Sequence, residues 1–449
     1  MSKTSRQGDD LRKIPEVAAL DAHQGLMRIP PELDVPLTRR VRQLIDSAEF
    51  RRLAHVSQLG LVALVYPAAN HTRFEHSLGV YRLTLLYLRR LSYDERFAAS
   101  VSVADAEMLI VAALLHDLGH WPFCHPIEDI ELPGIPPHEL FANSFLLEGE
   151  IADALRDDWG IKPRDVVTLL SEKPRDVRHR ILSSILSGPI DVDKLDYLFR
   201  DSLHAGVPYG RNFDQGRLIS SLRLNAAGDG LAISDKGRTA AEMMVFARYI
   251  MFSEVYWHHA VRSATAMLQR AFYLLHHSLD LDAAFRMTEH AMVAAMCEVA
   301  DGPARELLDG LFGTRRRLYK RVLQLSILER SDLYKMLARK PYPWLVGCAE
   351  QFATLASGAL GRVVAPHEII FDAPPAHREV EFKIDVYYPK EDRYRRLVDV
   401  SPVVRALAVE QFDDHVKRVR LFAHPRIANE LRNRGDLIDL VRQAAAAMN

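Results

Sequence analysis

The stretch MLIVAALLHDLGHWPFCH, Met108–His125, sets an apolar run against two adjacent polar residues, His116 and Asp117. The run predicts a helix over residues 105–118 that is apolar on nearly all sides, as expected at the centre of a bundle. Neighbouring helical residues point about 100° apart, so the two groups cannot share one side of the helix. Burying both without partners would cost on the order of several kcal/mol. A shared cation removes that cost, so the stretch predicts a metal site.

Periodicity elsewhere in the chain also favours helices. Thr38 has the features of an N-cap for a helix that reaches about Gln58, and residues 73–91 carry an apolar stripe at helical spacing. Further helical patterns cover residues 139–157, 163–171, 175–187, 191–202, 240–280, 402–421 and 424–447. The sequence therefore predicts a mostly α fold built on a helical bundle.

Two segments alternate apolar and polar residues, as strands do. The stretch LRLNAAGDGLAIS, residues 222–234, alternates on both sides of a Gly-Asp-Gly turn and predicts a small β-hairpin. The stretch REVEFKIDVYYP has the same period, with apolar residues at Val380, Phe382, Ile384, Val386 and Tyr388. A change in composition near residue 301 predicts three parts: an N-terminal extension, 1–35; a catalytic core, 36–300; and a smaller C-terminal α+β region, 301–449, with an oligomerisation or regulatory role.

Ligand-type residues occur near three predicted helix ends. They are His76, the pair His116–Asp117, and the aspartates of PIDVDKLDYLFRD, which are Asp191, Asp193 and Asp196. Helix ends that meet at one pocket can bring together residues from distant segments. Two imidazoles with two carboxylates suit a divalent ion such as Mn, Fe, Zn, Ni, Co or Mg, and leave positions open for water and a phosphate oxygen. The pattern alone does not choose among the three aspartates.

Three blocks, RFEHSLGV, LLHDLGHWPFCH and DVDKLDYLFRDSLHAGV, follow one another in this order along the chain. Together they resemble the HD-domain phosphohydrolases, named for their paired His and Asp, and most of all the branch of deoxynucleoside triphosphate triphosphohydrolases. The likeness covers about residues 50–280 and implies an HD-domain helical bundle for the core. It further implies that the metal ligands are His76, His116, Asp117 and Asp193. Asp191 and Asp196 then serve as capping or hydrogen-bonding residues nearby.

Several side chains near the paired His and Asp suit a phosphate. Arg73 could place its guanidinium fork on phosphate oxygens, and Lys194 could contact another phosphate. The resemblance implies that His120 and His125 line the phosphate site. It also implies that His138, in PPHELF, protonates the leaving oxygen, a role that suits the near-neutral pKa of histidine. The predicted catalytic residues are thus His138, His120, His125, Arg73 and Asp117. Without the resemblance, His138 reads equally well as an early residue of a helix.

The resemblance also implies a sugar-binding side of the pocket. Tyr197 and Asp201 lie on one helical face with Lys194, and this face meets the ribose and phosphates in the resembling enzymes. Gln58 and Leu59 match a pair that contacts the sugar, and Arg248 and Tyr256 match further phosphate and sugar contacts more loosely. Aromatic residues at such spacing are also common in cores. Phe252 replaces a histidine of the vertebrate enzymes, and Trp257, His258 and His259 differ from them too, so the base preference does not carry over.

The bulk composition excludes some classes of protein. Lys and Arg total 58 and Asp and Glu total 59, a net charge of -1, which disfavours a general polyanion binder and hence nucleic acid as a partner. Three cysteines without a CxxC pair, Cys124, Cys297 and Cys348, favour a reducing, cytoplasmic compartment. The first residues lack the apolar segment of a signal peptide, and no apolar run reaches the roughly 18–20 residues of a membrane span. We therefore expect a soluble protein without a membrane partner.

The strongest basic run is TRRRLYKRV, Thr314–Val322. It fits the solvated face of a helix, or a site for the phosphates of an effector nucleotide or nucleic acid. The resemblance implies nucleotide control at subunit contacts, and so a homo-oligomer, either a dimer or a tetramer.

The sequence therefore predicts a metal-dependent phosphohydrolase that converts a dNTP to a deoxynucleoside and triphosphate. Two alternatives stay open. One is a phosphodiesterase or phosphomonoesterase acting on nucleotides or signalling nucleotides, because one fold hosts many chemistries. The other is a non-catalytic protein that senses nucleotides or binds nucleic acid.

Overall fold

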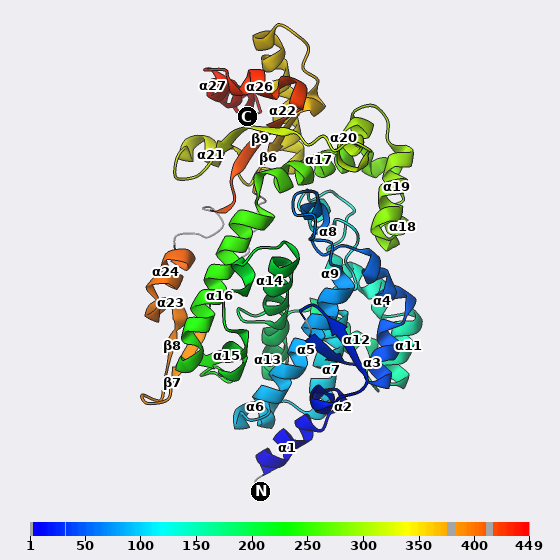
Figure 1. The fold of residues 1–449 in the computed structure, drawn as a ribbon, viewed down its shortest axis with the longest axis vertical. Helices are drawn as coiled ribbons and strands as arrows, with labels where there is room; N and C mark the ends of the chain where they lie inside the picture. The colour runs from blue at the N-terminus through cyan, green and yellow to red at the C-terminus, as the bar shows by residue number, and fades with distance from the viewer. Residues whose placement is uncertain (1–2, 32, 375–382, 410–415, 449) are drawn as a thin grey trace.

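The computed structural model describes residues 3–31, 33–374, 383–409 and 416–448. The expected mostly α fold is confirmed, with three small sheets among the helices (Figure 1). Within the described ranges, no helix combines the length and apolar character needed to cross a bilayer.

Three helices form the centre of the part of the fold that precedes residue 312. Helix α5 (Arg73–Leu91) packs against α7 (Val103–Leu115) and α14 (Val192–His204). Side chains from Leu109 to Leu115 are fully buried, as the apolar run predicts. A capping box of Ser102 and Asp105 starts α7, because each side chain accepts from the other residue's backbone N–H.

The other helices up to residue 312 surround this centre. They are α1 (Lys3–Arg12), α2 (Pro15–Ala18), α3 (Arg39–Ile45), α4 (Ala48–Arg52), α6 (Glu95–Ser100), α8 (Cys124–Glu128), α9 (His138–Phe141), α10 (Asn143–Leu146), α11 (Gly149–Asp157), α12 (Pro163–Ser171), α13 (Val177–Ser187), α15 (Gln215–Ser220), α16 (Arg238–Met251), α17 (His259–Leu275), α18 (Leu281–Arg286), α19 (Glu289–Val299) and α20 (Gly302–Phe312). Short 3₁₀ turns and a π turn, Phe252–Tyr256, connect several of them.

Some long predicted helices are broken in the structure. Thr38 caps its helix as expected, but Ser47 caps a second one by accepting from the N–H of Phe50, so α3 and α4 replace one continuous helix. The region 139–157 forms three short helices, and the π turn interrupts 240–280. The prediction of helix over 402–421 is wrong at its end. Residues 419–423 form strand β9, whose backbone pairs with strands on both sides.

The predicted hairpin is present and extends into a larger sheet. Strands β3 (Leu222–Leu224) and β4 (Leu231–Ser234) pair antiparallel, and Asn225 Oδ1 accepts from the N–H groups of Gly228 and Asp229 in the turn. Strand β7 (Asp385–Tyr388) pairs parallel to β4, and β8 (Arg393–Arg396) follows it antiparallel. Val380 and Phe382 lie outside the described residues. A separate two-stranded sheet joins β1 (Leu26–Ile29) and β2 (Leu33–Pro36).

A second hydrophobic core lies at the C-terminal end (Figure 1). Strands β5 (Lys320–Leu325), β9 (Val419–Ala423) and β6 (Ile369–Asp372) form an antiparallel sheet with β9 in the middle. Helices α21 (Ser331–Leu337), α22 (Tyr342–Leu360), α26 (Pro425–Arg432) and α27 (Leu437–Ala446) complete this region. Helices α23 (Leu397–Val400) and α24 (Pro402–Val409) instead accompany β7 and β8 beside α16. The region after residue 301 therefore contributes to two sheets; its regulatory role stays a prediction.

Candidate metal centre

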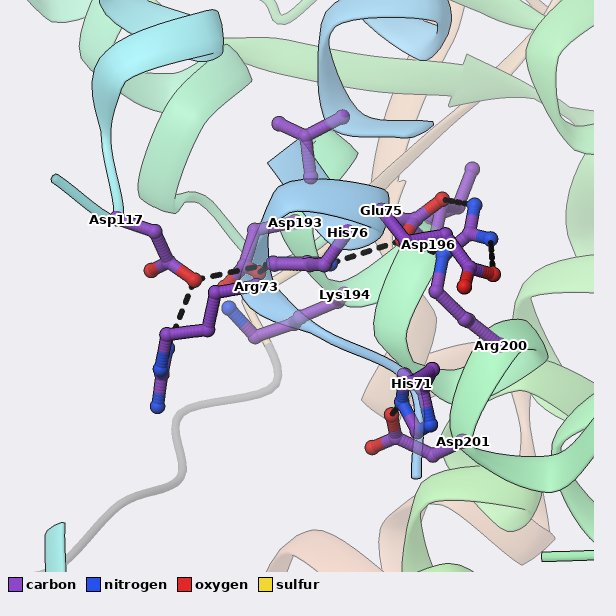
Figure 2. A network of polar contacts seen from close by, with 12 residues as sticks. His71, Arg73, Glu75, His76, Asp117, Asp193, Lys194, Asp196, Arg200 and Asp201 are labelled. Atoms are coloured by element: carbon purple, nitrogen blue, oxygen red, sulfur yellow. Dashed lines mark hydrogen bonds and ion pairs between the residues drawn. The ribbon is translucent and has the colours of Figure 1, made fainter. Parts of the chain in front are cut away.

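Three helix ends bring the predicted ligands to one place, and Figure 2 shows three of them, His76, Asp117 and Asp193. His76 lies in the first turn of α5, which Thr72 caps by accepting from the N–H of Glu75. His116 and Asp117 follow the last residue of α7, and Asp193 lies in the first turn of α14. The chain turns sharply after Asp117, at Gly119. A Cβ there would lie 2.1 Å from the carbonyl oxygen of His138, so only glycine allows this approach.

The four side chains converge closely. His76 Nε2 lies 3.0 Å from Asp193 Oδ1 and 3.3 Å from His116 Nε2. His116 Nε2 lies 3.3 Å from Asp117 Oδ1, and His76 Nε2 lies 3.9 Å from Asp117 Oδ2. One ion at the centre of these atoms could therefore contact all four side chains after small adjustments.

Hydrogen bonds on the far side of each imidazole set its protonation. The Nδ1 of His116 lies 2.9 Å from the carbonyl oxygen of Ala113, and the Nδ1 of His76 lies 2.8 Å from Asp196 Oδ2. Both oxygens accept, so each Nδ1 carries a hydrogen, and each Nε2 is the atom that faces the centre. Once Nε2 is deprotonated, the set of two imidazole nitrogens and two carboxylates fits a divalent cation.

The charges of the centre point the same way. Burial alone would lower the pKa of His76, but hydrogen bonds to Asp193 and Asp196 raise it to about 10. Burial alone would raise the pKa of Asp117, but His120, Arg73 and the two imidazoles hold it well below its usual range. Arg73 Nη1 donates to Asp117 Oδ2 at 2.7 Å, so the guanidinium predicted to bind phosphate contacts a carboxylate predicted to bind the metal.

A buried ion pair supports His76 from behind. Asp196 receives two hydrogen bonds of 2.8 Å from Arg200, whose Nη1 also donates to Glu75 Oε1 at 2.6 Å. His204 adds a contact of 2.9 Å to the same oxygen of Glu75. Asp191 caps α14 by accepting from the N–H of Lys194. The expectation that Asp191 and Asp196 are capping and hydrogen-bonding residues thus agrees with the geometry.

We expect Gly79→Ala to weaken both stability and metal binding. A Cβ at this position of α5 would lie 1.9 Å from Asp196 Oδ1 and 2.3 Å from Arg200 Nη2. Alanine favours helices by about 1 kcal/mol over glycine, but overpacking costs about 1–3 kcal/mol, and metal affinity should fall about 10–100-fold as His76 loses its support. Urea unfolding and metal titration would measure these effects. A variant as stable as the parent, with unchanged affinity, would contradict the expectation.

A cluster of three histidines lies next to the metal centre. The centroid of the His120 ring lies 3.9 Å from the centroid of the His138 ring and 5.1 Å from that of the His125 ring. His120 is buried, and burial with the charge of Arg73 holds its pKa well below the usual value, although Asp117 opposes the shift. His125 is exposed. The structure therefore brings all three predicted histidines together.

The sequence analysis missed Glu128, which joins this cluster. Its Oε1 lies 2.9 Å from His138 Nδ1, and its Oε2 lies 3.5 Å from His125 Nδ1. Burial would lower the pKa of His138, but Glu128 raises it overall. The spacing of His125 and Glu128, three residues apart in α8, was the available signal.

The predicted sugar-side residues Tyr197 and Asp201 lie one and two turns further along α14 than Asp193, on the same helical face. Tyr256 donates to Asp201 Oδ2 at 2.6 Å, and His71 Nε2, which the sequence analysis also missed, lies 2.9 Å from Asp201 Oδ1. The rings of Tyr197 and Tyr256 lie 6.5 Å apart. Burial raises the pKa of both tyrosines and Arg248 opposes the rise, which places its charge near them.

The remaining predicted contacts are partly engaged within the protein. The N–H of Gln58 donates to the carbonyl oxygen of His71 at 3.0 Å, which holds Gln58 and Leu59 beside the start of α5. Lys194 Nζ lies 2.5 Å from Asp191 Oδ2 and 3.2 Å from the carbonyl oxygen of Gly188. Two of the three ammonium hydrogens of Lys194 are thus engaged within the protein, which leaves one for a phosphate.

Comparison with known proteins places this geometry in a family. A model of the HD domain matches residues 73–200, and a model of the HD associated region matches residues 213–437. This chain belongs to the HD-domain phosphohydrolase superfamily. The metal centre lies within the first matched segment, and the HD-domain protein continues into its associated region through the β3–β4 hairpin, α16 and α17.

Individual relatives support the assignment. The HD-domain protein is similar to an HD domain-containing protein of Acanthamoeba polyphaga mimivirus, with 30% identity over 69% of this chain and 70% of the viral protein. It is 26% identical to the deoxynucleoside triphosphate triphosphohydrolase SAMHD1 of Gallus gallus, over 74% of this chain but only 57% of the chicken enzyme. A crystal structure of a hypothetical protein from Aquifex aeolicus has a TM-score of 0.71 and 28% identity, and covers 91% of this chain and 98% of its own. The HD-domain protein therefore lies near the triphosphohydrolase branch.

Proposed function

We propose that the HD-domain protein hydrolyses a deoxynucleoside triphosphate to a deoxynucleoside and triphosphate. The observation that carries the proposal is the convergence of His76, His116, Asp117 and Asp193, with Arg73 and the histidine cluster directly beside them. The similarity to a deoxynucleoside triphosphate triphosphohydrolase supports the choice of substrate.

The side chains divide the reaction among themselves. A divalent ion held by the four ligands supplies Lewis-acid polarisation of the α-phosphate and a water of lowered pKa. Arg73 and neutral His120 donate hydrogen bonds to phosphate oxygens. His138, whose pKa Glu128 raises, gives its proton to the 5′-oxygen as the bond from that oxygen to the α-phosphorus breaks and the water oxygen bonds to phosphorus. Asp201, held by His71 and Tyr256, positions the sugar.

The released product tests the proposal. Purified protein is incubated with each dNTP and NTP in the presence of Mn, Fe, Co, Ni, Zn or Mg, and the products are separated by chromatography. Triphosphate with deoxynucleoside is the expected result. Orthophosphate or diphosphate would instead indicate a phosphomonoesterase or phosphodiesterase, and nucleotide binding without any product would indicate a non-catalytic sensor.

We expect Glu128→Gln to move the alkaline limb of the pH profile of kcat/KM to lower pH. A general acid acts in its protonated form, so the rate falls as pH rises through the pKa of His138. Glu128 raises that pKa, and the neutral amide no longer does. Glu139→Gln, which removes a carboxylate 3.5 Å from His138 Nε2, should cause a smaller shift in the same direction. Profiles that superimpose on that of the parent would exclude His138 as the acid.

We further propose that the basic run 314–322 binds the phosphates of an effector nucleotide. The alternative of a solvated helix face is wrong as to the helix, because residues 314–315 form a bend, 316–319 irregular chain and Lys320 the start of β5, but the basic side chains are exposed as that alternative expected. They line a cleft of about 1010 Å³ that five cations face: Arg316, Arg317, Lys320, Arg321 and Arg432. None of the metal-centre residues lines this cleft, so an effector would bind apart from the substrate.

The paired change Arg317→Glu and Arg321→Glu tests the effector site. Assays at low dNTP concentration would compare the rate of dNTP hydrolysis with and without added GTP. Effector coupling typically spans about 5–150-fold, so the parent should be activated by a factor in this range and the double variant should not. Arg156→Glu, an exposed change on α11, should preserve activation. Activation that survives the double change would place the effector elsewhere. The oligomeric state is tested separately: light scattering with and without GTP would detect the expected dimer or tetramer.

A further inference from the structure

A second group of metal-ligating side chains lies beside the metal centre. A ring nitrogen of His120, a ring nitrogen of His138 and Sγ of Cys124 all lie within 4.8 Å of one another. His120 and Cys124 are 3% and 2% exposed. Within residues 3–31, 33–374, 383–409 and 416–448, this is the only such group that contains a thiol. The mechanism above uses the two histidines and leaves the cysteine without a role.

The local backbone builds this group. Cys124 is the first residue of α8, and Phe123 before it has a φ of 56°, in the left-handed region. That conformation costs a bulky residue on the order of 1–2 kcal/mol. The turn at Phe123 starts α8 so that Cys124 lies against His120, four residues earlier, and against His138 at the start of α9.

The surroundings of the thiol exclude nucleophilic chemistry. Burial and the charge of Glu128 raise the pKa of Cys124 well above its usual value, so the reactive thiolate does not form freely at neutral pH. Coordination to a metal ion deprotonates a thiol outright. A cation bound by the neighbouring histidines would therefore make Cys124 a ligand in spite of its raised pKa.

The donor set differs from that of the metal centre and selects a softer ion. One thiolate and two imidazoles are typical zinc ligands, with Zn–N of about 2.0–2.1 Å and Zn–S of about 2.3 Å. Tetrahedral coordination then separates the ligand atoms by roughly 3.3–3.6 Å, so side chains that now place these atoms within 4.8 Å of one another must rotate to close around the ion. The carboxylate of Glu128 on His138 Nδ1 resembles the carboxylates that orient metal-binding histidines.

We propose that His120, Cys124 and His138 bind a zinc ion separate from the ion at the metal centre, and that this zinc inhibits hydrolysis. The inhibition rests on the proposed function, because zinc turns the phosphate-binding His120 and the acid His138 into ligands. His138 then has no proton to give to the leaving oxygen. Zinc binding itself does not depend on what the protein hydrolyses.

Ultraviolet absorption of cadmium thiolate tests the binding. The full-length protein, loaded with Mn²⁺, is titrated with Cd²⁺ as a probe for zinc, and only a cysteine ligand produces the thiolate charge-transfer band. We expect a band that saturates at one equivalent and disappears when Zn²⁺ is added. Cys124→Ser should abolish the band, whereas Cys297→Ser, at a half-buried cysteine outside the group, should keep it. A parent protein without the band, or a band that persists in Cys124→Ser, would overturn the proposal.

His138→Gln provides a second variant in case Cys124→Ser does not fold. Removing this ligand should lower the affinity for Zn²⁺ by at least about 100-fold, measured by competition with a chelating dye. Unchanged affinity would exclude His138 as a ligand.

Activity assays test the inhibition separately. Zn²⁺ at the concentration that fills the thiol site should slow the parent at least tenfold and should slow Cys124→Ser much less, each relative to its own rate without zinc. Equal inhibition of the two would place the inhibitory zinc at the metal centre and overturn this part of the proposal. If no nucleotide is hydrolysed under any condition, the proposed function fails, while the cadmium band still decides whether the zinc site exists.

Discussion

Replacing Asp117 by asparagine is expected to reduce nucleotide hydrolysis at least about 10³-fold, because the change removes the charge that binds the ion and anchors Arg73. Asp117 lies 3.3 Å from His116 Nε2 and 2.7 Å from Arg73 Nη1, and it is 4% exposed. Asparagine keeps the shape but carries no charge, so the two imidazoles are left with one charged carboxylate, that of Asp193, to help them bind the ion. Elemental analysis of the purified variant should find the metal content reduced to a small fraction of that of the parent.

Asp153→Asn is the matched control for this change. Asp153 is exposed and pairs with Arg156 on α11, away from the metal centre. Its loss should leave both metal content and turnover at parental values. Removal of the ion from the parent by a chelator should match the effect of Asp117→Asn, and activity should return when the ion is restored. An Asp117→Asn protein that keeps a full equivalent of metal and hydrolyses nucleotides normally would refute the ligand assignment.

The second large effect is expected from Asp196→Asn, which should lower the free energy of unfolding by about 3–5 kcal/mol. Asp196 and Arg200 form a buried pair with two hydrogen bonds of 2.8 Å, and removing the charge of Asp196 leaves the buried guanidinium with Glu75 in place of two carboxylates. The affinity for metal should also fall about 10–100-fold, because an amide oxygen replaces the charged carboxylate that accepts from His76 Nδ1 and orients its ring. Chemical denaturation and metal titration would measure the two effects.

An internal control has the same residue types and spacing at the surface. Asp282 and Arg286 are also four residues apart on a helix and hydrogen-bonded, but Asp282 is 71% exposed. Asp282→Asn should change stability by less than about 1 kcal/mol. If both variants lost the same small amount, burial would not be the source of the stability at Asp196.

The acid limb of stability gives an independent check on Asp196. Burial alone would raise its pKa, but Arg200 and His76 lower it to about 2. A carboxylate with a lowered pKa stabilises the fold above its unfolded pKa of about 3.9, and loses this contribution as pH falls toward its folded pKa. The parent should therefore lose stability between about pH 4 and pH 2 more steeply than Asp196→Asn does.

Local patterns predicted those features of this protein that depend on residues close in sequence. The apolar run ending at Leu115 forms α7, Thr38 caps α3, and the turn after Asn225 closes the β3–β4 hairpin. Each depends on interactions within a few residues, so the sequence carries the whole signal. The adjacent His116 and Asp117 indicated a metal in the same way, because burial of both groups requires a charge partner wherever the rest of the chain lies.

The tertiary structure alone decided what requires distant segments to meet. Strand β9 was predicted as helix, and only its position between β5 and β6 fixes it as a strand. His71 contacts Asp201, and Glu128 contacts His138. No periodicity in the sequence connects the members of either pair. Backbone hydrogen bonds and apolar spacing act locally, whereas the surroundings of a polar side chain depend on packing across the whole chain. The sequence by itself therefore determined a helical protein and predicted a metal-ligating His and Asp, and the fold determined which partners orient those two side chains and surround them.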